Sequence, residues 1–192
     1  VALSVEGVSA VIALVSQIGR GYLAIEWSLY LAQLLVIDFS GLALAAVLAF
    51  FVHVLVDHKY IGHAVMVLYY VSKIALVAIG VEEPLVQYAS SPSTPYSDMN
   101  GYGHLLGPFF WFRAYWSGFA VLLVVAGYAL FVRGRERRLR ARIAAGRQRL
   151  GPFSKLLAAA GALVFVVAGG TIFHFTHVVN RYETAKDKER KR

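Results

Sequence analysis

Five long apolar runs, separated by short polar segments, constrain this chain more than any other feature of its sequence. They cover residues 1–18, 35–56, 61–81, 107–132 and 153–179. Each approaches or exceeds the roughly 20 residues that a helix needs to cross the hydrocarbon of a bilayer. Lipid offers backbone groups no hydrogen-bonding partners, and barrel strands are only about half as long and alternate in polarity. The sequence therefore predicts an all-α, polytopic transmembrane helical bundle of about five spans.

Composition supports a membrane protein and excludes several chemistries. The chain is 58% hydrophobic over 192 residues, which is too apolar for a soluble domain of this size, and its charges are concentrated between the runs. It has no cysteine, so disulfides, iron–sulfur clusters and thiolate catalysis are excluded.

The distribution of basic residues predicts the orientation. Residues 133–155 hold nine Lys and Arg and one acid, and this surplus, nine minus one, equals the net charge of +8 of the whole chain. A basic block between two spans is typical of a cytoplasmic segment on anionic lipid rather than of a nucleic-acid site. We therefore expect a basic cytoplasmic linker at 133–152, an external loop at 82–106, an extra span at 153–179 and an external tail at 180–192, with no nucleic-acid partner.

The first fifty residues suggest a helix outside the bilayer core. The chain opens with Val1 inside an apolar run and shows no signal-peptide pattern, so we expect its first residues to come from the middle of a longer protein. Between residues 22 and 34, Leu23, Trp27, Tyr30 and Leu31 recur at helical spacing, which favours an amphipathic helix in the outer interface. An extramembrane helix packed on another domain would show the same pattern.

Small residues in the apolar runs predict close contacts between helices. Because small side chains let two backbones approach, pairs four residues apart often mark helix interfaces in membranes. The candidates are Gly41 with Ala45, Ala158 with Ala162, Gly161, and the pair Gly169 and Gly170.

Ionisable residues inside the apolar runs are candidates for function, because a charge within a bilayer is costly. Lys73 lies deepest, whereas Asp38 and Arg113 lie near predicted outer boundaries, where long side chains can extend to the surface. The depth of Glu6 is not defined by the sequence. A plain buried pair is the alternative to a mechanistic role.

Histidines raise two further alternatives. His53 and His63 flank the turn near residue 57, and His174 and His177 share a helical face level with His104. Two histidines on different helices are what a bis-imidazole haem needs, and His174 with His177 and a carboxylate would suit a metal. No H-E-x-x-H or C-x-x-C pattern accompanies them, so interfacial histidines without a ligand are the preferred interpretation.

The loop before the fourth run is rich in turn-forming and aromatic residues, which is typical of an ordered cap rather than a flexible tether. We expect it to act as an external gate. Its candidate residues are Tyr96, Asp98, Asn100, Tyr102 and His104. Asp98, Asn100 and His104 could together hold a cation, but such side chains in a Gly/Pro-rich loop more often bond their own backbone.

Three segments carry a resemblance to a known family. They are residues 57–63 (DHKYIGH), 96–104 (YSDMNGYGH) and 169–189 (GGTIFHFTHVVNRYETAKDKE). Together they resemble bacterial proteins in which ABC-exporter-type permease helices precede a zinc aminopeptidase of the aminopeptidase N type. In that family the positions of His174 and His177 are usually other residues, which argues against ligand roles carried over from it.

The resemblance implies a permease segment of an ABC-type exporter in the bacterial inner membrane. The chain has no G-x-x-x-x-G-K-[ST] motif, so ATP would be bound by a separate ABC ATPase subunit, and no H-E-x-x-H, so any zinc would belong to a domain beyond Arg192. The resemblance also implies a dimer or paired permease halves. Two alternatives remain: a membrane anchor for an external peptidase that transports nothing, and a haem-binding electron carrier.

Overall fold

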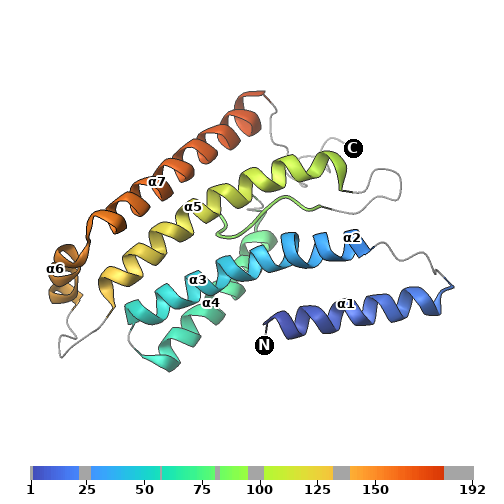
Figure 1. Ribbon diagram of the computed structural model, residues 1–192, viewed down its shortest axis with the longest axis horizontal. Coiled ribbons are helices and arrows are strands. Elements are labelled where there is room, and N and C mark those ends of the chain that lie inside the picture. Colours follow the sequence, from blue (N-terminus) through green and yellow to red (C-terminus); the bar gives the residue numbers. More distant parts are fainter. Residues whose placement is uncertain are drawn as a thin grey trace. The chain divides into compact units, whose positions relative to one another are not determined.

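The fold is known from a computed structural model that describes residues 2–21, 27–56, 58–80, 83–94, 102–131 and 139–179 (Figure 1). Within these ranges the secondary structure is helical, and no strand occurs. The α-helices are α1 Ala2–Gly19, α2 Trp27–Leu31, α3 Phe39–Val56, α4 Lys59–Ala78, α5 Leu106–Leu130, α6 Leu139–Arg149 and α7 Pro152–Phe173. Two π-helical segments, η1 Ala32–Asp38 and η3 His174–Val179, and one 3₁₀ turn, η2 Gly103–Leu105, complete the helical elements.

Among the described residues, four helices are long and apolar enough to cross a membrane: Gln33–Val56, Lys59–Ala78, Leu106–Leu130 and Pro152–Val178. They coincide closely with four of the five predicted spans. The first predicted span, residues 1–18, forms α1, of which the described apolar stretch Gly7–Gly19 is shorter than a span requires. The all-helical class is therefore confirmed, whereas the count of five spans is not.

The chain divides into two compact units, Val1–Ala46 and Val47–Arg192. In the first unit, the Tyr30 hydroxyl of α2 donates to Gln17 Oε1 of α1 at 2.5 Å. Helix α2 passes into η1 and then α3 with helical dihedral angles at both junctions. The separate interfacial helix predicted at 22–34 is thus not confirmed: residues 22–26 lie outside the described part, and residues 27–34 continue into the span.

In the second unit, α5 and α7 lie side by side (Figure 1). Glycines allow this approach, because a Cβ on Gly118 would lie 2.7 Å from the backbone nitrogen of Phe165 and one on Gly161 would lie 3.0 Å from the carbonyl oxygen of Gly118. Beside them the Tyr115 and Phe165 rings stack at 4.4 Å. The predicted close contact is confirmed at Gly161, and also at Gly169, where a Cβ would meet the Tyr115 ring.

The basic segment contains a short helix that its charge pattern does not predict. Helix α6 packs against the end of α5, where a Cβ on Gly146 would lie 2.8 Å from the Ala129 oxygen. Its Arg142 is only 4% exposed. An α-helix leaves its last four carbonyls without helical partners. The end of α5 is therefore stabilised where the Arg142 guanidinium donates to such a carbonyl. The linker at 133–152 is therefore structured over Leu139–Arg149 rather than a plain connection.

Candidate functional site

The candidate site lies where residues 83–94 fold back against α4 and α5. Two side chains of this segment, Gln87 and Tyr88, are buried at 7% and 8% exposure. The Tyr88 ring meets Trp116 edge-on at 5.2 Å and Phe119 at 5.8 Å, both on α5. Aromatic pairs at these distances contribute beyond the area that they bury. The segment is therefore anchored by aromatic packing and is not a tether.

Three side chains of α4 and α5 donate to two consecutive carbonyls of this segment. The Tyr69 hydroxyl donates to the Tyr88 oxygen at 2.7 Å, and Lys73 Nζ donates to the same oxygen at 3.4 Å. Arg113 Nη1 donates to the Ala89 oxygen at 3.3 Å. Ala89 has a φ of 57°, a left-handed conformation that costs a non-glycine residue roughly 1–2 kcal/mol. These donors hold the segment in that turn.

The predicted intramembrane residues Lys73 and Arg113 thus meet at one site, although they lie on different helices. Both cations also lie near aromatic rings, Lys73 5.8 Å from the Tyr69 centroid and Arg113 4.8 Å from that of Phe109. Such contacts partly offset the cost of removing a cation from water. Asp38 belongs to the first unit, where it accepts a hydrogen bond from Gln33 Nε2 at 3.0 Å. Glu6 also belongs to the first unit and falls within α1.

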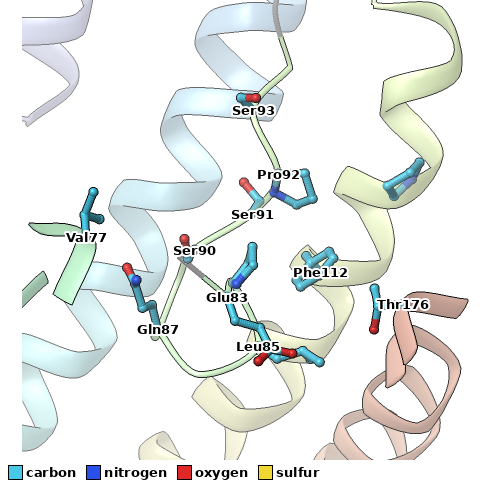
Figure 2. Close-up of a pocket in the computed structure, with 12 residues that line it drawn as sticks. Val77, Glu83, Leu85, Gln87, Ser90, Ser91, Pro92, Ser93, Phe112 and Thr176 are labelled. Atoms are coloured by element: carbon cyan, nitrogen blue, oxygen red, sulfur yellow. The ribbon is translucent and has the colours of Figure 1, made fainter. Parts of the chain in front are cut away.

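A cavity of about 490 Å³ opens beside the folded segment. Figure 2 shows the labelled residues of the segment between Val77 of α4 on the left and Phe112 of α5 and Thr176 of η3 on the right. Its lining is Val77, Glu83, Pro84, Leu85, Gln87, Ser90, Ser91, Pro92, Ser93, Pro108, Phe112 and Thr176. Hydroxyl, amide and carboxylate groups among proline and aromatic surfaces suit a small, partly polar ligand.

The two histidines predicted to form a pair on the last helix contact different neighbours. His177 Nε2 lies 3.4 Å from Glu83 Oε1, and the His177 ring stacks on Phe173 at 4.5 Å. His174 instead lies edge-on to Phe175. Within the described ranges no three His, Cys, Asp or Glu side chains converge as metal ligands would. His177, through Glu83, therefore links η3 to the rim of the cavity.

The other histidine pair lies at the turn between α3 and α4. The rings of His53 and His63 meet edge-on at 4.8 Å, and His53 Nδ1 lies 2.7 Å from the Ala49 oxygen. The close approach depends on Gly62, whose Cβ would lie 2.7 Å from the His53 ring. Because the two rings touch, a haem between them would require both to move.

The predicted gate residues fall only partly within the described chain. Tyr96, Asp98 and Asn100 lie outside the described residues. Tyr102 precedes η2, where its carbonyl accepts from the Leu105 N–H at 3.0 Å, and His104 lies within η2. Tyr69, Gln87 and Tyr88 were not among the site residues predicted from the sequence. The sequence feature that could have identified Tyr69 is its spacing of four residues from Lys73, which places both side chains on one face of a helix.

Known proteins offer no further guide to the site: no protein-family model, no curated protein and no solved structure matches this chain.

The burial of Tyr88 predicts how the stability of the protein changes at high pH. Burial, with a smaller effect from the neighbouring Tyr69 phenol, raises the pKa of Tyr88 to about 12 from an ordinary value near 10. The folded state thus favours the neutral phenol, so its contribution to stability is complete below about pH 10 and is lost between about pH 10 and 12. We expect Tyr88→Phe to flatten the fall in unfolding free energy over that interval, measured in detergent micelles.

The control for this titration is Tyr60→Phe, which removes a phenol that is exposed in the structure. Tyrosinate absorbance of both variants reports how many phenols ionise. If Tyr88→Phe leaves the alkaline loss of stability unchanged from the unmutated protein, the Tyr88 phenol is not shielded as described.

Proposed function

We propose that this chain is the membrane-spanning permease segment of an ABC-type exporter in a bacterial inner membrane. It moves substrate by alternating access driven by a separate ATPase subunit, and works as a dimer or as one of two paired permease halves. The basic segment is cytoplasmic and the 83–94 segment external. In the parent protein the chain precedes a zinc aminopeptidase domain, which the extra span α7 presents outside.

The observation that carries this proposal is the anchored 83–94 segment beside its open cavity. Lys73 and Arg113 reach it from two different candidate spans, so a relative movement of α4 and α5 would change both contacts together. A gate needs a folded element whose position depends on the spans around it. A plain membrane anchor needs neither half-buried cations at an external segment nor a cavity, so these features favour transport over anchoring.

The contacts of helix α6 suggest how ATP hydrolysis on a separate subunit could move the candidate spans. Arg142 bonds to the last turns of both α3 and α5, so a push on α6 would move the two spans together. In the proposed orientation α6 lies on the cytoplasmic side, where an ATPase subunit would act. The two ends of the unit would then be coupled through α5, which reaches both α6 and the 83–94 segment.

The test is ATP-dependent transport by the protein purified with its ATPase subunit. We expect vanadate-sensitive ATP hydrolysis in proteoliposomes that contain both subunits. Replacing Tyr69 by Phe and Lys73 by Met together should lower transport roughly tenfold while membrane insertion is kept, because both donors to the Tyr88 carbonyl are lost.

The matched control is Tyr70→Phe, which changes the adjacent but exposed tyrosine and should leave transport intact. If the chain inserts and supports peptidase activity outside the cell but no ATPase accompanies it, the anchor function is correct and the permease proposal is wrong.

The proposed orientation makes a separate prediction. Cysteines introduced at Ser93 and Ala144 are both exposed in the structure, and the chain has no native cysteine to interfere. In intact cells an impermeant thiol reagent should label Ser93→Cys strongly and Ala144→Cys only after the membrane is opened. Labelling in the opposite order would reverse the topology.

A further inference from the structure

Helix α6 divides its arginines between two opposite faces. The face that packs on the spans carries Arg142, Gly146 and Arg149, and Arg149 Nη1 donates to the Phe131 oxygen at 2.8 Å. The other face carries Arg140 and Arg147, both exposed. Residues three and seven apart share one side of a helix. The two exposed arginines therefore form a single surface on the side of α6 opposite Arg142.

An apolar side chain lies between these two arginines. Ile143 is 47% exposed and sits three residues after Arg140 and four before Arg147. We call these three residues the α6 outer face. At a bilayer surface, an isoleucine in this position can reach the acyl boundary while the guanidinium groups on either side reach phosphates.

The packing of α6 places this face at the level of a bilayer surface. Arg142 Nε donates to the Leu130 oxygen at 2.9 Å, and its Nη2 donates to the Val54 oxygen at 2.5 Å. These carbonyls belong to the last turns of α5 and α3, which are two of the four candidate spans. Because α6 lies level with the ends of hydrocarbon-length helices, its exposed side chains lie where lipid headgroups begin.

The first turn of α7 also exposes apolar side chains next to a cation. Phe153 is 75% exposed, and Leu156 and Lys155 in the same turn are exposed as well. Exposed aromatic and aliphatic side chains beside cations are costly in water but favourable at the headgroup boundary. The residues 139–149 include four arginines and no acid, so the ligand must supply negative charge.

We propose that the α6 outer face binds the headgroup phosphates of anionic phospholipids, with Arg140 and Arg147 on the phosphates and Ile143 against the acyl chains. This site is independent of the transport function proposed above. Arginine suits the role because its planar guanidinium can donate two parallel hydrogen bonds to one phosphate. An acidic protein surface would match the charge, but it would leave the adjoining Ile143 and Phe153 without an apolar partner.

The experiment measures phospholipid binding to the full chain in neutral detergent by native mass spectrometry, with phosphatidylglycerol and phosphatidylcholine as probes. We expect the chain to prefer phosphatidylglycerol. Replacing Arg140 and Arg147 by Gln should weaken that binding roughly thirtyfold, because each arginine near an anionic surface contributes about 1 kcal/mol, which is roughly five- to sixfold in affinity. Ile143→Ser should weaken binding of both lipids.

Two controls make the outcomes decisive. The double variant Arg20→Gln/Lys188→Gln removes the same charge from residues outside the α6 sequence and should keep the preference. The Arg140→Gln/Arg147→Gln variant should unfold at the same temperature as the unmutated chain, because both side chains are exposed.

The proposal is overturned by any of four results. Equal binding of the two lipids would show that the α6 outer face does not discriminate by headgroup charge. An equal loss in the charge-matched control would show attraction to net charge only. Full competition by inorganic phosphate would show a free-anion site, and binding of polyglutamate in place of phosphatidylglycerol, with the same sensitivity to Arg140 and Arg147, would show a protein-binding surface.

Discussion

Replacement of Gly118 by leucine is expected to separate α5 from α7 and to cause the largest loss of stability of any single substitution considered for this chain. A Cβ at this position would lie 2.7 Å from the Phe165 nitrogen and 2.8 Å from the Gly161 oxygen. Both are backbone atoms, so a change of side-chain rotamer on α7 cannot relieve the clash. Overpacking typically costs about 1–3 kcal/mol, and we expect at least the upper end here.

The free energy of unfolding in mixed detergent micelles measures this loss. The matched control is Gly170→Leu, because a Cβ on Gly170 has no atom within 4 Å. Gly118→Ala should give an intermediate loss, since a single methyl already meets backbone. Equal stability of the Gly118→Leu and Gly170→Leu variants would contradict the described contact between the two helices.

Arg142→Ala is expected to produce the second large effect, a loss of about 3 kcal/mol in unfolding free energy. The guanidinium donates to Leu130 of α5 and to Val54 and Leu55 of α3, so its removal leaves helix-end carbonyls of two spans without these donors. Arg142→Lys should recover little, because an ammonium group is a compact donor that cannot reproduce the planar fork of a guanidinium.

Arg140→Ala is the control, since it removes the same charge from the same helix at an exposed position. Limited proteolysis between α5 and α7 provides a second measurement, because α6 should detach in the Arg142→Ala variant alone. If the two alanine variants unfold with the same free energy, α6 is held by its glycine contact and not by Arg142.

The sequence by itself determined the candidate spans and two of their contact points, Gly161 and Gly169. Residues 35–56, 61–81, 107–132 and 153–179 were predicted within a few residues of the observed helices, because an uninterrupted apolar run of this length has only one stable backbone conformation in lipid. Gly161 was identified because small residues are where membrane helices approach. These properties depend on local composition, so they can be predicted before the fold is known.

Other conclusions required the tertiary structure. Lys73 and Arg113 were recognised as unusual, but their partner carbonyls at Tyr88 and Ala89 lie 15 and 24 residues away in the chain. Nothing in the sequence distinguished Arg142 from the other basic residues around it, and the Val54 carbonyl that it binds is 88 residues away. A backbone carbonyl is the same in every residue, so which one a cation finds is decided only when distant helices pack together.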